Sequence, residues 1–378
     1  MPIAFVEPDR EEGAVVVVFL RGGADGLSLV PPIGDDDYHR ERPRLAVSPA
    51  EALRLDGFFG FHPALRGLDR LFEEGVLTVV PACGSDDDTR SHFEAQDLME
   101  QGGRSQGGGW LGRFLRRGKE LLRPDEQLDA PDPVAGALTA VAFGPSLPLS
   151  LLGAPGAVAL RSIDELRLGE SERPLAAPLA RLYDDDPLLG PSAREALRAL
   201  DTVERLRAEP YPLAAGAHYG DDDFSAGLRL VAQLVKSNLG LRAACVDLPG
   251  WDSHALQSQV MEPLMRSLAS GLVALAADLG PRLSRTSIVV MTEFGRRVGE
   301  NSALGTDHGR GSAMFVMGGG TPGGVRGPWP GIGPARLEGP GDVHVATDYR
   351  DVLAPMLARH GASAEAVFPG RGSNPTSA

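Results

Sequence analysis

The residues of this sequence that could do chemistry lie in five short segments, each next to an apolar run. The segments carry Asp, Glu, His or Ser, which are side chains that bind metal ions or act as nucleophiles. They are Asp25 in "RGGADGLSLVPP", Ser91 and His92 in "GSDDDTRSHFEAQ", Asp252 and His254 in "DLPGWDSHALQ", Glu293 in "TEFGRRVGENS", and Asp307 and His308 in "GTDHGRG". Carboxylates gather only where a cation compensates their charge, so convergence of these segments indicates a metal site.

The ligand types narrow the choice of metal. Imidazole together with carboxylate suits zinc, manganese or iron, whereas an all-oxygen site suits magnesium or calcium. No Cys accompanies the five segments, which argues against a structural zinc site. We expect one or two divalent metal ions, with zinc favoured and manganese, magnesium or calcium as the alternatives.

Ser91 has the position expected of a nucleophile. A hydroxyl at a helix N-terminus lies where backbone N–H groups and the helix dipole favour negative charge, and a nearby metal lowers its pKa. Arg90 and those N–H groups could together hold a phosphate or sulfate, and His92 is expected to support Ser91. The order Ser91-x-x-Glu94 also spells a helix capping box. The two roles are compatible.

The other segments have structural alternatives as well. These are a helix cap for Asp252 or Ser253 with His254 in the first turn, an ion pair with Arg296 or Arg297 for Glu293, and a turn for Asp307–His308. Each alternative is reasonable for one segment alone. Because all five segments follow or precede apolar runs, we favour a shared site.

Five apolar runs must position these residues. They are rich in β-branched residues and bounded by Gly, Pro or acidic turns, which is typical of buried strands. The runs cover residues 14–20, 76–83, 241–246, 287–291 and 313–317. Strands that are apolar on both faces are typical of a parallel sheet covered by helices on each side.

Segments with helical periodicity alternate with the apolar runs. They cover residues 63–74, 91–101, 192–206, 225–238, 257–278 and 349–360. The alternation predicts a doubly wound α/β sheet, in which ligands bind beyond the carboxyl ends of the strands. We expect one α/β domain over residues 1–378, with a loop-rich insertion or cap at about 102–220.

Composition excludes several classes of partner. The 378-residue chain has a formal net charge of -14 and no basic run, so nucleic acid and anionic membranes are not expected partners. No apolar run reaches eighteen residues, so no membrane span is expected. The N-terminus shows no leader pattern, so we expect the chain in the cytoplasm as written, or outside it if a leader has been removed. The expected partner is a small anionic ester, and nothing indicates an oligomeric state.

Six blocks in this order resemble the signature segments of the domain-of-unknown-function family number 1501. They are "RGGADGLSLVPP", "RSHFEAQDLMEQG", "GGWLGRFL", "GWDSHALQ", "TEFGRRVGEN" and "GTDHGRGSAMFVMGG", and the closing "DYRDVLAPMLARHG" also fits. That family is usually grouped with the alkaline phosphatase and sulfatase superfamily. The resemblance implies a three-layer α/β/α sandwich with a mainly parallel, alkaline-phosphatase-like sheet, one or two divalent metals, and a nucleophile at a helix start. Members often carry a twin-arginine leader, which is not in this sequence.

The resemblance also implies a role for each candidate residue. Asp25 matches the first metal-binding Asp, Ser91 the nucleophile, Asp252 and His254 the ligands of the metal nearer the leaving group, Glu293 a ligand beside Ser91, and His308 the late His ligand, with Asp307 as its support. Two features depart from the superfamily: Glu293–Phe294 stands where relatives have Asp–His, and the spacing in "WDSH" is short. They leave open a single metal, a weakened site or a lost activity.

The sequence thus predicts a metal-dependent hydrolase of phosphate or sulfate esters that uses Ser91 as its nucleophile. The alternative is a weakened or inactive relative that binds an anionic ligand or a partner protein. A dinucleotide-binding enzyme is disfavoured, because the first apolar run leads into "RGGADG" rather than a G-x-G-x-x-G turn.

Overall fold

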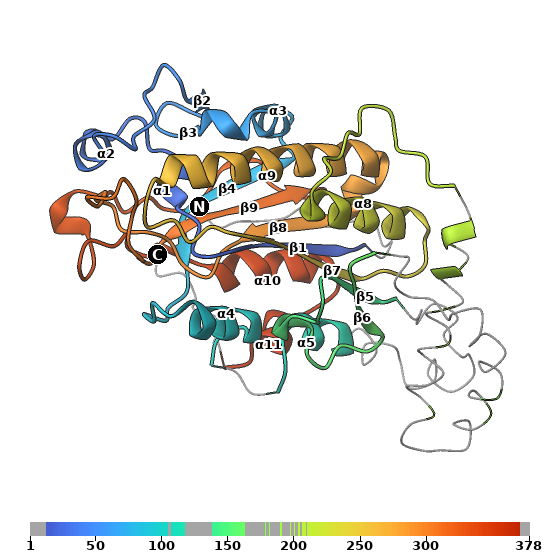
Figure 1. The fold of residues 1–378 in the computed structure, drawn as a ribbon. Coiled ribbons are helices and arrows are strands. Elements are labelled where there is room, and N and C mark those ends of the chain that lie inside the picture. Colours follow the sequence, from blue (N-terminus) through green and yellow to red (C-terminus); the bar gives the residue numbers. More distant parts are fainter. Residues whose placement is uncertain are drawn as a thin grey trace.

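In the computed structural model of this chain, a nine-stranded sheet forms the middle layer (Figure 1). The structure describes residues 13–104, 107–117, 138–162 and 210–370, and scattered positions between 163 and 209. The strands are β1 Val15–Arg21, β4 Leu77–Gly84, β5 Ala140–Phe143, β6 Ala157–Leu160, β7 Ala243–Pro249, β8 Ser287–Met291, β9 Ser312–Gly318, β10 Gly324–Val325 and β11 Thr347–Asp348. Their order is β10-β4-β9-β8-β1-β7-β5-β6, and β11 pairs with β4.

The direction of β9 decides where its preceding loop lies. β9 pairs antiparallel with β4 and with β8, and the other pairs in this sheet are parallel. The first residue of β9, Ser312, therefore lies beside Cys83 near the carboxyl end of β4. As a result, the loop before β9 and the loops after β1, β4, β7 and β8 meet at one edge of the sheet.

Helices cover both faces of the sheet (Figure 1). One face carries α3 Leu68–Glu73, α8 Asp223–Lys236 and α9 Gln257–Leu279, and the other carries α4 His92–Gln101, α5 Trp110–Arg117, α10 Tyr349–Arg359 and α11 Ala364–Val367. Alternate residues of β1 enter separate cores: Val16 and Val18 face α8 and α9, whereas Val17 and Phe19 face α5 and α10. The predicted three-layer sandwich with a mainly parallel sheet is confirmed.

Shorter elements complete the described chain. They are α1 Gly26–Leu29, α2 Asp36–Glu41, a small hairpin of β2 Leu53–Arg54 and β3 Gly60–Phe61, and the 3-10 turns η1 Pro63–Leu65, η2 Leu149–Leu151, η4 Gly280–Arg285 and η5 Pro334–Arg336. All five predicted strands are confirmed, as β1, β4, β7, β8 and β9. The predicted helix 63–74 is split into η1 and α3 at Gly67, whose φ is +104°.

Two predicted segments, 192–206 and 102–220, extend beyond the described residues. The predicted helix 192–206 falls largely outside the described residues. Within the stretch 102–220, the described part includes α5 and the strands β5 and β6, which extend the main sheet beyond β7. These strands have only four residues each, which is too short for a clear apolar run.

One segment of the described chain, Gln257–Arg285, is long and apolar enough to cross a membrane by length and composition alone. Half of its most apolar window is buried inside the fold. It packs against α8 and α3 and contributes Leu268, Leu272 and Leu275 to the core. This burial is what a core helix requires, so the segment is weak evidence for a membrane span.

A buried ion pair fixes the loop after β1. The Asp25 carboxylate accepts hydrogen bonds from the Leu27 N–H at 3.2 Å, the Ser28 hydroxyl at 2.7 Å and the Gln257 amide at 2.6 Å. It also pairs with the Arg42 guanidinium, whose Nη2 lies 3.1 Å from Oδ1. Both side chains are buried, at 0–1% exposure.

Arg42 also donates hydrogen bonds to the backbone. It donates to the carbonyl oxygens of Val298 at 2.7 Å and Arg297 at 2.8 Å, so it ties the loop after β8 to α2. Burial would raise the pKa of Asp25, but the charge and hydrogen bonds of Arg42 outweigh it and hold that pKa below its usual range.

Replacing Arg42 should therefore be costly. Arg42→Met leaves the Asp25 carboxylate buried without its counter-charge, and we expect the free energy of unfolding in urea to fall by about 3–5 kcal/mol. Arg40→Met is the matched control, because Arg40 lies in the last turn of α2, which Arg42 caps, and pairs with Asp37 on the surface. A loss no larger than that of the control would contradict the assignment.

Candidate metal centre

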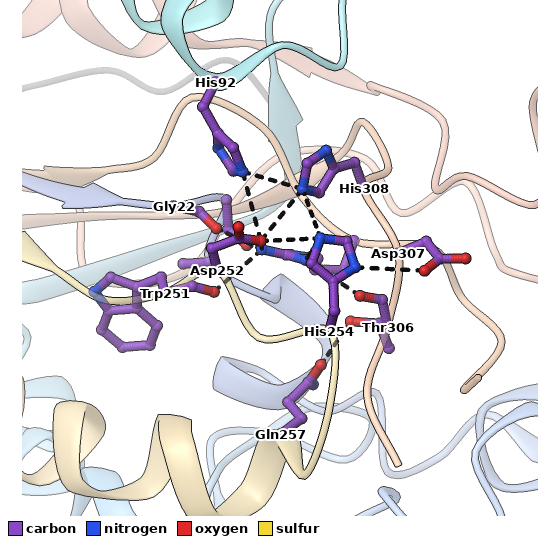
Figure 2. A network of polar contacts seen from close by, with 12 residues as sticks. Gly22, His92, Trp251, Asp252, His254, Gln257, Thr306, Asp307 and His308 are labelled. Carbon is purple, nitrogen blue, oxygen red and sulfur yellow. Dashed lines mark hydrogen bonds and ion pairs between the residues drawn. The ribbon is translucent and has the colours of Figure 1, made fainter. Parts of the chain in front are cut away.

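Three histidines and one aspartate point toward one another at the carboxyl edge of the sheet (Figure 2). His92 begins α4, Asp252 and His254 follow β7, and His308 precedes β9. The Nε2 atom of His308 lies 3.0 Å from Nε2 of His92, 2.9 Å from Nε2 of His254 and 3.3 Å from Oδ1 of Asp252. The same Oδ1 lies 3.0 Å from His254 and 3.5 Å from His92.

Glycines allow the loops to come this close. Gly22, with a φ of +120°, lies where an added β-carbon would be 2.5 Å from the amide nitrogen of Asp252. A β-carbon on Gly305 would be 2.3 Å from the carbonyl carbon of His254. Any larger residue at either position would push apart the backbones that carry Asp252, His254 and His308.

The outer nitrogen of each ring fixes how the ring is protonated. Nδ1 of His308 lies 2.9 Å from the carbonyl oxygen of Arg90, and Nδ1 of His92 lies 2.8 Å from Oε1 of Glu293. Both oxygens are acceptors, so both Nδ1 atoms carry the hydrogen. In a neutral ring this leaves the lone pair on Nε2, which faces the centre.

The inner nitrogens therefore need a positive species between them. Two Nε2 lone pairs at 3.0 Å repel each other unless a proton or a metal ion lies at that place. The carbonyl or carboxylate partner behind each ring is the arrangement that orients metal-binding histidines in proteins. His254 follows the same pattern more loosely, since its Nδ1 lies 3.5 Å from Oδ1 of Asp307.

The distances fit a small divalent cation. For bonds of about 2.0–2.1 Å in a tetrahedral zinc site, neighbouring ligand atoms are about 3.3 Å apart. The three separations among Nε2 of His92, Nε2 of His308 and Oδ1 of Asp252 are 3.0, 3.3 and 3.5 Å. Among the described residues, His92, Asp252 and His308 form the group whose ligand atoms all lie within 4.8 Å of one another.

Neighbouring charges, hydrogen bonds and burial shift the pKa values of His92, His308 and Asp252 in different directions. The hydrogen bond to Glu293 raises the pKa of His92, whereas burial lowers the pKa of His308. Burial acts to raise the pKa of Asp252, but hydrogen bonds from Arg296 and His308 outweigh it and bring that pKa to about 2. A proton on Nε2 of His92 can be shared with His308. A divalent cation would compete with that proton for one place.

Glu293 lies behind His92 and not at the centre of the cluster. Its Oε1 accepts from Nδ1 of His92, the Gln96 amide at 2.8 Å and the Gly22 N–H at 2.9 Å, and its Oε2 accepts from the Thr292 hydroxyl at 3.0 Å. Burial opposes ionisation, but the hydrogen bonds of His92 and Gln96 outweigh it and lower the pKa of Glu293. The sequence predicted Glu293 as a metal ligand; in the structure its oxygens contact Nδ1 of His92 and the donors of Gln96, Gly22 and Thr292.

Arg296 is a buried cation next to the cluster. Its guanidinium donates to Oδ1 of Asp252 at 2.7 Å. It also donates to the carbonyl oxygens of Gly22, Gly23, Trp251 and Thr306, at 2.5 to 3.2 Å. These contacts hold the loops after β1 and β7 and the loop before β9 around one side chain.

Phe294 supports the imidazoles from a third side. Its ring centre lies 4.8 Å from that of His92 and 5.0 Å from that of His308, and the residue is 4% exposed. An apolar ring in this position limits the ways in which both imidazoles can turn. The departure seen at this position in the sequence therefore puts an apolar ring against both imidazoles.

Ser91 is next to the cluster and its hydroxyl is not used as a cap. It is the N-cap residue of α4, yet its side chain makes no capping hydrogen bond. Glu94, which a capping box would use, accepts instead from the Thr89 hydroxyl at 2.9 Å. Ser91 is exposed and immediately precedes His92. Arg90 pairs with the buried Asp342 and holds His308 through its carbonyl oxygen.

The structure thus distributes the predicted site residues over three places. His92, Asp252, His254 and His308 form the cluster, while Glu293 and Asp307 contact its outer nitrogens. Asp307 contacts His254 rather than His308, the ring for which it was predicted as support. Asp25 belongs to the ion pair with Arg42.

Sequence reasoning gave too little weight to two residues. Gln96 lies one helical turn after His92, and this spacing could have indicated a shared face of α4. Arg296 was considered only as an ion-pair partner of Glu293. No pattern in the sequence indicates that it binds four carbonyl oxygens.

Comparison with known proteins places the chain in a sequence family without assigning an activity. The family model described as "Protein of unknown function (DUF1501)" matches residues 81–376. No curated protein matches the chain.

Two solved structures have a similar arrangement. The C-terminal periplasmic domain of EcEptC from Escherichia coli, in complex with Zn, is 9% identical, with a TM-score of 0.37 over 85% of this chain and 77% of that one. The PsFucS1 sulfatase from Pseudoalteromonas sp. is 13% identical, with a TM-score of 0.33 over 83% of this chain and 64% of that one. At these low values, activity has to be argued from the chain's own residues.

The contact between Glu293 and His92 can be tested directly. Because the Glu293 carboxylate raises the pKa of His92, Glu293→Gln should lower it. NMR titration of the His92 ring protons in chelator-treated protein measures the change. Glu300→Gln is the control, since Glu300 binds Arg44 and should leave the His92 titration as it is. An unchanged His92 pKa in Glu293→Gln would show that the carboxylate does not act on this ring.

Proposed function

The chain belongs to the DUF1501 family of proteins of unknown function, and from that premise we propose that it is a metal-dependent hydrolase of phosphate or sulfate esters. The observation that supports this most is the protonation pattern of the imidazoles. In their neutral forms, His92 and His308 each direct an Nε2 lone pair inward, because their Nδ1 atoms donate to Glu293 and to the Arg90 carbonyl. A divalent cation is the species for which such an arrangement is suited.

His92, Asp252, His254 and His308 would hold the metal, and zinc suits this mixture of nitrogen and oxygen ligands. When bound there, a divalent cation supplies positive charge that stabilises negative charge developing on ester oxygens. Arg296 keeps Asp252 ionised and oriented by its hydrogen bond at 2.7 Å. Phe294 and Glu293 hold the ring of His92 in place.

Ser91 would be the nucleophile. Its hydroxyl is exposed and free of a capping bond, and it stands at the first turn of the ten-residue helix α4, where N–H groups favour an anion. Its oxygen forms the bond to phosphorus or sulfur while the bond to the ester oxygen breaks. The alcohol leaves with that electron pair and takes up the proton given by Ser91. Water then hydrolyses the seryl ester, which releases phosphate or sulfate and restores the hydroxyl.

A second candidate is a metal-dependent binding protein that does not turn over its ligand. The observation that favours it is the packing of Phe294 against His92 and His308. A side chain at this position of the site has no polar atom to offer a second metal. Such a protein would retain the metal and bind phosphate or sulfate, but it would not release alcohol from an ester.

Metal content and turnover separate these candidates. Protein purified without chelator should contain about one equivalent of zinc or another divalent metal, and His308→Ala should lose it. His62→Ala is the control, because His62 caps η1 outside the cluster. A full complement of metal in His308→Ala would contradict the centre.

Replacing the proposed nucleophile tests the chemistry. Ser91→Ala should keep its metal but hydrolyse aryl phosphate or aryl sulfate about a thousandfold more slowly. Ser85→Ala, in the same loop, should leave the rate unchanged. Equal rates for Ser91→Ala and wild type would rule out Ser91 as nucleophile. Metal retention without turnover of either ester by wild type would favour the binding protein.

A further inference from the structure

A cavity of about 540 Å³ lies beside the metal centre, between α4 and the carboxyl ends of β1, β5 and β7. Its volume is within the range of about 300–1,000 Å³ that is usual for small-molecule sites. Open α/β sheets bind ligands at this edge. Phe143, Pro148 and Pro249 give the cavity apolar walls.

The cavity shares a wall with the metal centre. The Gln96 side chain lines the cavity, accepts from Nη1 of Arg21 at 3.1 Å and donates to Glu293 at 2.8 Å. Glu293 in turn holds the ring of His92. A molecule in the cavity would therefore lie beside the candidate reaction site.

Arg21 is already committed to two carboxylates of the lining. Its Nη2 lies 2.5 Å from Oε1 of Glu100, and its Nε lies 2.7 Å from Oδ2 of Asp247. Glu100 is 5% exposed and also accepts from the Ser150 N–H at 3.2 Å. The positive charge of Arg21 is therefore neutralised within the wall, with one carboxylate in excess.

The remaining charged residues keep the lining acidic. Asp97 on α4 and Asp223 at the start of α8 add two carboxylates, and Arg161 adds one guanidinium. Together the described lining residues carry four carboxylates and two guanidinium groups. An apolar cavity with this excess of negative charge is complementary to an organic cation and repels an organic anion.

We propose that this cavity binds a small organic cation, with an apolar body between Phe143 and the prolines and a protonated amine attracted by Asp97 and Asp223. The binding does not require hydrolysis at the metal centre. The proposal of cation binding is therefore independent of the function proposed above.

Three probes of one shape test the charge preference. Phenylpropylamine, phenylpropanol and phenylpropanoate share an apolar body and differ in charge at neutral pH. In calorimetric titrations at low salt, the amine should bind about tenfold or more tightly than the alcohol, and the carboxylate least tightly. Equal affinity for amine and alcohol, or no binding by the amine, would overturn the proposal.

Matched variants locate the binding. The double variant Asp97→Asn with Asp223→Asn should bind amine and alcohol alike, because the attracting charges are gone. Asp221→Asn removes a neighbouring carboxylate outside the cavity and should keep the preference. A preference that survives the double variant, or one that Asp221→Asn removes equally, would place the amine elsewhere. His308→Ala should bind the amine as wild type does, which separates this result from any loss of the metal.

Discussion

The candidate site depends on the hydrogen bonds of one buried group, the Arg296 guanidinium. A buried cation is costly unless every donor finds an acceptor, and Arg296 finds its acceptors in the carbonyl oxygens of Gly22, Gly23, Trp251 and Thr306 and in Asp252. These acceptors lie on three loops that are far apart in sequence. Each loop must approach closely enough to complete the set, which fixes Asp252 and His254 relative to the strand ends.

Arg42 also connects loops through hydrogen bonds, in the outer part of the site. It joins α2, the Asp25 turn and the backbone of Arg297–Val298, so the segment that carries Arg296 is itself held by a second buried guanidinium. Loops at a sheet edge have little apolar packing. Here two buried cations, Arg42 and Arg296, hold the loops together instead, at 0–1% exposure. The imidazoles need less support of their own, because carbonyl and carboxylate partners already set their orientation.

The sequence was sufficient for the parts of the fold with local signals. The apolar runs of β1, β4, β7, β8 and β9 are continuous, and the polar residues beside them converge as the carboxyl-edge rule requires. It was insufficient where partners are distant: Glu293 meets His92 across 201 positions, and Arg42 meets the carbonyl oxygens of Arg297 and Val298 across 255 and 256 positions. Strand direction was also hidden, because the run 313–317 has the same composition whether β9 is parallel or antiparallel. Only the antiparallel direction brings His308 to the edge where His92 and Asp252 lie.

Helix α4 sets the distance between the candidate metal centre and the cavity. His92, Gln96 and Glu100 are four residues apart, so they lie along one side of the helix at steps of about 6 Å. The candidate metal centre and the far wall of the cavity are then separated along α4 by about 12 Å. Inserting one residue between His92 and Gln96 would turn the rest of the helix by about 100°, and would carry Gln96 and Glu100 away from Glu293 and Arg21 while His92 stayed in place. The spacing within α4, more than any one side chain, therefore sets which molecules could reach both places at once.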